Sequence, residues 1–207
     1  MRIVFATQNQ GKIAEIKEIM ADTGYEVLPM GALGLKAEAE ENGETFSENA
    51  EIKAREVYDK LSALGDVEDT IVMADDSGFC IDHLSGAPGV HSARFMGHDT
   101  DYRIKNEAIL KKMEGVERPE RGAQFVCSIC AIFPDGHAEF TEGVLSGEVA
   151  MEPKGDEGFG YDPIFYLPRY GKTTAELGDK FKNSVSHRSL ALHKMNELIK
   201  ERLASGI

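Results

Sequence analysis

The stretch from Ile71 to Phe95 constrains this chain most, because an apolar strand there breaks directly into two neighbouring carboxylates. The run Ile71–Ala74 is typical of a buried β-strand, and Asp75-Asp76-Ser77-Gly78 follows at once. Two carboxylates at the end of a buried strand are costly unless cationic groups face them. The same position in an open α/β sheet is where ligands bind. The segment is therefore either a turn, which favours Asp, Ser and Gly, or a metal or catalytic site.

Length and composition are those of an ordinary globular protein. The 207 residues, 42% hydrophobic and 29% charged, suffice for one large domain or a two-lobed one. No apolar run approaches the length of a bilayer span. The first residues, Met1–Ala6, enter a strand pattern directly and lack the features of a signal peptide. We therefore expect a cytoplasmic protein with no membrane partner.

The net charge of −13 argues against broad binding to nucleic acid, which relies on a basic surface. A small anionic ligand remains compatible with this charge if positive groups gather locally or a divalent metal is present. The sequence therefore predicts no nucleic-acid partner.

The cysteine pair Cys127 and Cys130 has the C-x-x-C spacing of redox and zinc sites. Its surroundings, Phe125–Phe133, have the pattern of a strand, and residues i and i+3 of a strand point to opposite faces. We therefore interpret both as buried core thiols.

The N-terminal segment has a strand–loop–helix pattern. A strand over Arg2–Ala6 leads through Thr7–Lys12 into a helix whose apolar positions recur at helical spacing. This arrangement places backbone N–H groups and the positive end of a helix dipole beside Thr7, Asn9 and Lys12, as a phosphate site requires. The alternative is that Thr7 and Asn9 simply cap the helix.

A second helix follows the acidic run Glu38–Glu44. Thr45 is a candidate cap for it, with Glu48 completing a capping box. Asn49 and Lys53 lie one turn apart beside its apolar stripe, so that both can face a cleft, although a lysine there often only covers apolar surface. Further along, Asp99–Met113 has the pattern of a helix, with Ile104, Ala108 and Met113 as inner positions, and Gln124–Phe133 with His137–Leu145 that of a hairpin.

Two segments in the last third of the chain carry candidate ligand contacts. The Gly-rich stretch Gly155–Pro163 allows a close approach to a flat ligand, with Phe159 or Tyr161 to stack on a base and Asp162 to accept from ring N–H groups. The alternative is a loop with core aromatics. Before the last helix, Ser186 is a good N-cap, and Lys182, His187 and Arg188 gather where an anion is favoured, or are merely solvated.

Together these groups suggest a magnesium-dependent site for a nucleotide polyphosphate. Lysines and carboxylates that converge with a Gly-framed aromatic fit this ligand, because Mg²⁺ uses one or two protein carboxylates plus the phosphates of the substrate. A water deprotonated by a nearby Asp is the expected nucleophile.

Five motifs in order resemble the inosine triphosphate pyrophosphatase family, whose members are also called dITP/XTP pyrophosphatases or Ham1-like proteins. The matching motifs are Thr7-Gln8-Asn9 with Lys12, Ala74–Gly78, Gly86–Val90 with Ser92-Ala93-Arg94, Gly158–Pro163 and Ser186-His187-Arg188. The resemblance runs from Arg2 to the final helix. It implies an α/β fold over residues 1–207, with a long mixed β-sheet flanked by helices and two lobes around a central active-site cleft. It also implies a homodimer that hydrolyses ITP, dITP and XTP or dXTP to the monophosphate and pyrophosphate with Mg²⁺.

The resemblance assigns roles to individual residues. Glu40 and Asp76 are the expected magnesium ligands, and Asp76 is also the catalytic proton acceptor. Glu40 is preferred to Glu41 or Glu38 by its spacing to Gly43. The expected substrate contacts are Thr7, Gln8, Asn9, Gln10, Gly11, Lys12, Lys53, Ser77, Phe159, Gly160, Tyr161, Asp162, Lys182, His187 and Arg188. His187 and Arg188 would lie near the purine, and Ser189 replaces the small Gly usual in the family.

Strand alternation divides the two adjacent carboxylates. Asp75 and Asp76 should point to opposite faces, so Asp76 serves the metal and water while Asp75 supports the scaffold. The same divergence disfavours a phosphatase with an aspartyl-phosphate intermediate, which needs D-x-D. A second alternative is a nucleotide-binding sensor with this fold and no catalysis, but a pure binder has no need of a general base.

Overall fold

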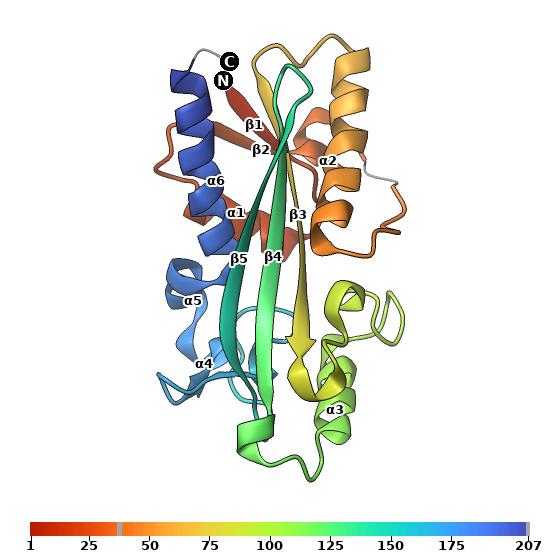
Figure 1. The fold of residues 1–207 in the computed structure, drawn as a ribbon, viewed down its shortest axis with the longest axis vertical. Helices are drawn as coiled ribbons and strands as arrows, with labels where there is room; N and C mark the ends of the chain where they lie inside the picture. The colour runs from red at the N-terminus through yellow and green to blue at the C-terminus, as the bar shows by residue number, and fades with distance from the viewer. Residues whose placement is uncertain (37–38, 206–207) are drawn as a thin grey trace. The chain divides into compact units, whose positions relative to one another are not determined.

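The computed structural model describes residues 1–36 and 39–205, and its strands join in one mixed sheet (Figure 1). The strand order is β2-β1-β3-β4-β5-β6-β7. β1 pairs in parallel with β2 and β3, whereas β6 pairs antiparallel with β5 and β7. The predicted mixed α/β sheet is confirmed. The strands are β1 (Arg2–Phe5), β2 (Glu26–Pro29), β3 (Thr70–Ile81), β4 (Gly122–Ile132), β5 (Ala138–Val149), β6 (Phe165–Leu167) and β7 (Lys172–Thr173).

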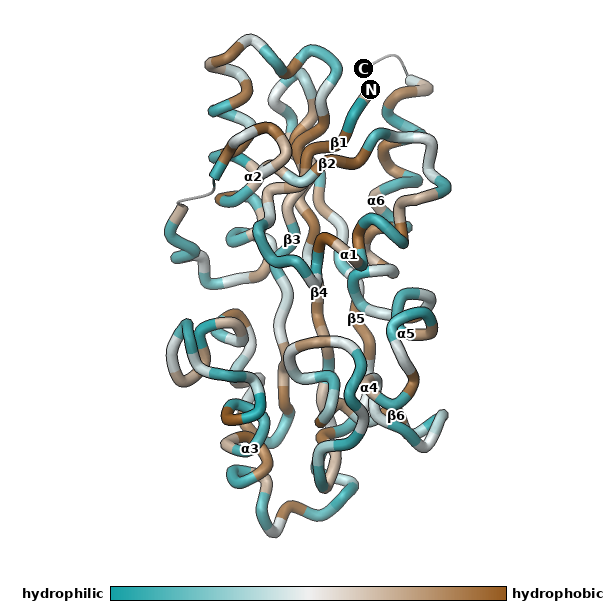
Figure 2. Tube along the Cα trace, turned by 180° about the vertical axis from the view of Figure 1, so that it is seen from behind, coloured by the Kyte–Doolittle hydropathy of each residue, from teal (hydrophilic) through white to brown (hydrophobic). Residues whose placement is uncertain are grey.

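Helices alternate with the first strands and follow the last ones. They are α1 (Gln10–Ile19), α2 (Phe46–Ala63), α3 (Tyr102–Lys112), α4 (Thr174–Leu177), α5 (Asp179–Val185) and α6 (His187–Ala204). In Figure 2, α2 and α6 alternate between hydrophilic and hydrophobic colours, as expected for helices that bury one side. Among the described residues, no helix combines the length and apolar character that crossing a membrane requires.

The chain forms two compact units. Unit 1 comprises residues 1–76, residues 127–143 and the chain from Arg188 onward, and unit 2 comprises residues 77–126 and 144–187. The boundaries fall inside β3, β4 and β5 and directly after His187. The two-lobed domain with a central cleft, expected from the sequence, stays a prediction.

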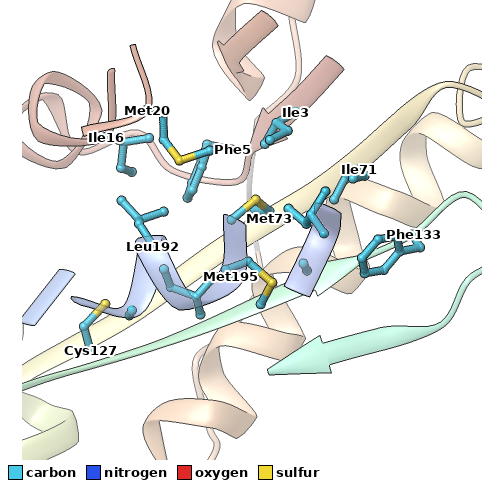
Figure 3. Packing of buried hydrophobic residues seen from close by; sticks show 14 residues of the cluster. Ile3, Phe5, Ile16, Met20, Ile71, Met73, Cys127, Phe133, Leu192 and Met195 are labelled. Atoms are coloured by element: carbon cyan, nitrogen blue, oxygen red, sulfur yellow. The ribbon is translucent and has the colours of Figure 1, made fainter. Parts of the chain in front are cut away.

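In unit 1 the strands bury both faces. One core cluster joins β1, β3 and β4 to α1 and α6, through residues such as Phe5, Met73 and Leu192 (Figure 3). The other joins the alternate strand residues, including Val4 and Val72, to α2. This double burial explains why these strands have continuous apolar runs. Cys127 belongs to the first cluster and Cys130 to the second, so the two thiols lie on opposite faces, as the strand pattern predicts.

The order of the first three strands places the predicted site residues. β1 lies between β2 and β3, so the chain leaves β1 on one side and returns on the other. Such a reversal marks the usual ligand position in an α/β sheet, outside the carboxyl ends of the strands. Because Phe5 pairs with Met73, the loop from Thr7 and the pair Asp75-Asp76 begin at the same level of the sheet.

Unit 2 has its own aromatic core. Phe79 packs on Phe125, Tyr161 and Phe165, with ring centroids 5.2, 5.3 and 5.7 Å apart. Ile109 of α3 and Met113, the C-cap residue of that helix, belong to this core. The predicted inner position Ile104 is wrong, because its side chain is 50% exposed. α3 begins at Tyr102 behind the N-cap Asp101, three residues later than predicted.

Candidate functional site

The loop after β1 is organised by helix capping. The side chain of Asn9 accepts a hydrogen bond from the Lys12 N–H at 3.1 Å, and Thr7 Oγ1 accepts from the Asn9 N–H at 3.2 Å. Gln8 and Gln10 are exposed, and Gly11 is half-buried. The capping alternative is therefore correct for Asn9, and phosphate binding by this loop stays a prediction.

Asp75 is the centre of a buried ionic group in unit 1. Its Oδ2 lies 2.9 Å from Lys12 Nζ and 3.1 Å from Arg188 Nη2, and Asp75 is only 2% exposed. Burial would raise the pKa of Asp75, but the nearby Lys12 and Arg188 outweigh it and hold the pKa below its usual range. Arg188 also pairs with Glu15 on α1. The group joins α1, β3 and α6, so Asp75 has the scaffold position that alternation predicts.

Asp76 faces other partners. Its Oδ1 accepts from Lys53 Nζ on α2 at 2.9 Å, and Glu41 Oε2 lies 3.6 Å from the same ammonium. Burial raises the pKa of Asp76 despite the attraction of Lys53. Burial alone would lower the pKa of Lys53. The nearby carboxylates outweigh burial and raise this pKa overall, and they belong to Asp76, Asp75 and Glu41. The pKa values of the two adjacent carboxylates are therefore shifted in opposite directions. Asp75 has two close cations, Lys12 and Arg188, whereas Asp76 has one, Lys53.

One oxygen of Asp76 is available for a metal. Asp76 Oδ2 is buried and has no hydrogen-bond partner among residues 1–36 and 39–205. A buried carboxylate oxygen without a partner is a suitable ligand for Mg²⁺, which prefers hard oxygen donors. The residues present therefore fit this ion, although no group of three or more potential metal ligands occurs in the described part of the chain.

The acidic loop before α2 presents a different glutamate than expected. Glu40 is exposed to solvent, whereas the carboxylate of Glu41 approaches Lys53. Glu38, the third alternative, lies outside the described residues. Asn49 holds this loop: its Oδ1 accepts from the Gly43 N–H at 2.9 Å. The choice of Glu40 as second metal ligand stays a prediction.

In unit 2 the Gly-rich loop is fastened by Asp162. Its Oδ2 accepts from Lys182 Nζ at 2.6 Å and from the Phe159 N–H at 2.9 Å, and its Oδ1 accepts from Thr174 Oγ1 at 2.8 Å. Lys182 Nζ also lies 4.4 Å from the centre of the Phe159 ring. Asp162 therefore orders the loop, with its carboxylate already engaged by protein donors.

The two rings of this loop have different surroundings. Tyr161 is 4% exposed, stacks on Phe79 and donates its hydroxyl to the Ser92 carbonyl at 2.8 Å. Its ring belongs to the core and is not available to stack on a base, so that part of the expectation is wrong. Phe159 remains half-buried and is the candidate stacking ring.

The cations expected around the last helix take different partners. Lys182 pairs with Asp162, His187 stacks on Phe125 with ring centroids 4.9 Å apart, and Arg188 enters the Asp75 group. Ser77 is half-buried at the start of unit 2. The structure thus brings together Lys12 with Arg188, Lys53 with Asp76, and Phe159 with Lys182. Contact of His187 and Arg188 with a purine stays a prediction.

Glu15 is the residue that sequence reasoning missed. It lies three residues after Lys12 and is buried beside Ile16. A carboxylate next to the apolar stripe of a helix, one turn from a lysine, is the signal that indicates a buried partner such as Arg188.

β3 continues without a break from Thr70 to Ile81, so the turn considered for Asp75–Gly78 is wrong, and the two carboxylates lie within the strand. Fold and site together define a class: an α/β protein whose buried carboxylates on β3, paired with lysines, suit a metal-associated anionic ligand. The chain belongs to the Ham1 family, whose sequence model matches residues 3–198.

Relatives extend over nearly the whole chain. The dITP/XTP pyrophosphatase of Bacillus subtilis is 41% identical over 95% of this chain and 96% of its own. That of Desulforamulus reducens is 43% identical over 96% of each chain. The solved Ham1 protein of Staphylococcus aureus has a TM-score of 0.83 at 37% identity, covering 98% of this chain and 100% of its own.

Proposed function

We propose that this protein hydrolyses dITP, ITP and XTP or dXTP to the nucleoside monophosphate and pyrophosphate. The observation that carries the proposal is Asp76, a buried carboxylate with one oxygen on Lys53 and the other without a partner in the described chain. Membership of the Ham1 family and relatives named dITP/XTP pyrophosphatases supply the substrate class. The enzyme is therefore a nucleoside-triphosphate pyrophosphatase.

Asp76 and Glu40 would hold the magnesium ion. When bound, Mg²⁺ neutralises charge on the phosphates and acidifies a water molecule. Lys53 fixes Asp76 through Oδ1, which leaves Oδ2 to act. Because burial raises the pKa of Asp76, its carboxylate is a better proton acceptor than an exposed aspartate.

The reaction needs one proton transfer and one displacement. Asp76 accepts a proton from water, the water oxygen bonds to a phosphorus of the α–β anhydride, and the bridging P–O bond breaks to release pyrophosphate. Thr7–Lys12, Lys53 and Ser77 bind the phosphate part of the substrate in this proposal. The start of α1 suits that role, because helix N-termini favour anions.

In this proposal the Phe159 ring stacks on the purine base, and the backbone of Phe159–Asp162 lies along it, assisted by Lys182, His187 and Arg188. Inosine and xanthine carry a 6-oxo group where adenine carries an amine. A hydrogen-bond donor of the protein that points at this 6-oxo group finds no acceptor when adenine is bound, or clashes with the adenine amine. Sites built on such hydrogen bonds reject the wrong partner strongly.

The test is a purine panel. Purified protein with Mg²⁺ is given dITP, ITP, XTP, dATP and dGTP, and pyrophosphate is measured separately from orthophosphate. The proposal predicts pyrophosphate from the first three at much higher kcat/KM. Equal rates on all five purines would contradict the specificity. Tight dITP binding without turnover would instead indicate the nucleotide-sensor alternative.

The proposal also covers the oligomeric state and the location of the protein. The active form is a homodimer. It acts in the cytoplasm, where it clears these nucleotides from the pool. Sedimentation of the purified protein at assay concentration tests the dimer, and a monomer that retains full turnover would exclude its necessity.

A further inference from the structure

Helix α3 turns a polar pair inward and an apolar side chain outward. Lys105 and Asn106 are 1% and 4% exposed, whereas their neighbour Ile104 is 50% exposed. A helix against a core normally buries its apolar residues, and buried polar groups are costly without partners. Burial also lowers the pKa of Lys105. The inward pair therefore needs a reason beyond packing.

Both residues donate to carbonyls of loops that carry family motifs. Asn106 Nδ2 donates to the Gly160 carbonyl at 3.2 Å. Gly160 belongs to Phe159–Asp162, the segment proposed above to hold the base and called the base loop from here on. Lys105 Nζ donates to the Ala93 carbonyl at 2.6 Å, in the segment 86–95.

The second attachment also reaches the base loop. Next to Ala93, the Ser92 carbonyl accepts the hydroxyl of Tyr161 at 2.8 Å. Ser92 Oγ accepts from the Phe79 N–H at 2.8 Å, which anchors segment 86–95 to β3. Two routes from α3 thus end on the base loop, one directly at Gly160 and one through Ser92 at Tyr161.

Asn106 is poorly explained by stability alone. Its Oδ1 is buried and without a hydrogen-bond partner in the part of the chain that the structure describes. An orphaned buried acceptor costs free energy that an apolar residue of the same shape would avoid. The benefit of the amide is therefore its donor, which holds the Gly160 carbonyl.

That carbonyl sets the orientation of a peptide in the base loop. Gly160 has φ +70°, a conformation in which glycine moves readily to other states. Since a trans peptide is planar, fixing the Gly160 carbonyl fixes the Tyr161 N–H in the opposite direction. Without Asn106, the Gly160 carbonyl loses this donor, and the peptide is held less firmly, through the Tyr161 side chain on Phe79 and Ser92.

We propose that Asn106, supported by Lys105, is a positioning residue for base discrimination that acts by orienting the Gly160–Tyr161 peptide. This role rests on the proposed function. In this proposal segment 86–95, to which no substrate contact is assigned, supports the base loop through its hydrogen bonds with Lys105 and Tyr161.

The test compares Asn106→Leu with Asn196→Leu. Asn196 is the matched control, since its Oδ1 is also buried without a partner in the described chain, but it lies on α6 in unit 1. Steady-state kinetics are measured with Mg²⁺ on dITP and dATP. In Asn106→Leu we expect KM for dITP to rise about tenfold, because the loss of one hydrogen bond corresponds to roughly a tenfold change. We expect kcat to stay within about twofold of the unmodified protein. The dITP-to-dATP ratio of kcat/KM should fall about tenfold, while the control keeps both values.

Unchanged KM and unchanged dITP-to-dATP ratio in folded Asn106→Leu would overturn the proposal, as would equal losses in the control. If the Leu variant loses its cooperative thermal transition, Asn106→Ala, which cannot overpack the site, is measured under the same criteria. Absence of dITP turnover by the unmodified protein would refute the proposed function itself, so the two failures are distinguishable.

Discussion

Replacing Asp75 with Asn should destabilise the protein strongly, because it removes the anion from a buried ionic group. Asp75 Oδ2 lies 2.9 Å from Lys12 Nζ and 3.1 Å from Arg188 Nη2, with almost no solvent to replace it. Removing one partner of a buried pair costs about 3–5 kcal/mol. Arg188 keeps Glu15 as a partner, so we expect the lower end, about 3 kcal/mol.

The loss is measurable by urea and thermal unfolding followed by circular dichroism. For a chain of this length, about 3 kcal/mol lowers Tm by roughly 6–12 °C. The control is Asp59→Asn on the exposed side of α2, which should stay within about 0.5 kcal/mol of the unmodified protein. A loss below about 1 kcal/mol in Asp75→Asn, with the control unchanged, would refute the view that Asp75 supports the scaffold.

Three other predictions concern stability. The pKa of Asp75 is lowered in the fold, so its stabilisation is fully present above the unfolded pKa and is lost as pH falls toward the folded pKa. The urea midpoints of Asp75→Asn and the unmodified protein should therefore differ fully above about pH 5 and converge progressively as the pH is lowered below that value. Lys182→Met leaves the Asp162 carboxylate buried without its cation and should cost about 3–5 kcal/mol in a thermal scan, whereas exposed Lys180→Met should be neutral. Thr45→Ala removes the capping box of α2 and should cost about 1 kcal/mol by urea unfolding; no change would show that the cap does not stabilise the helix.

Local rules predict several features from the sequence alone. Alternation along a strand separates Asp75 from Asp76 and Cys127 from Cys130, and the structure gives each pair different surroundings. The capping box at Thr45 forms as predicted, because it depends only on residues within one turn.

Features that depend on distant partners were not predictable in the same way. The sequence places Arg188 at a helix N-terminus and predicts that it binds an anionic ligand. In the structure it pairs with Asp75 and Glu15, which lie far away in the chain. For Tyr161 the sequence leaves a stacking ring and a core ring both open, and its contacts with Phe79 and Ser92 show that it is a core ring. Ile104 fits the apolar period of α3, but donation to loop carbonyls turns Lys105 and Asn106 inward instead.

The division of labour between two adjacent carboxylates is the central claim, and turnover of dITP by Asp76→Asn tests it most directly. Asp76→Asn removes the nearest carboxylate of Lys53 and leaves Glu41 at 3.6 Å, so we expect a lower Tm, and turnover is measured at a temperature where the variant is folded. Pyrophosphate release with Mg²⁺ should fall by about 10²-fold or more, the usual effect of losing a general base. Full activity in a folded Asp76→Asn protein would contradict the account.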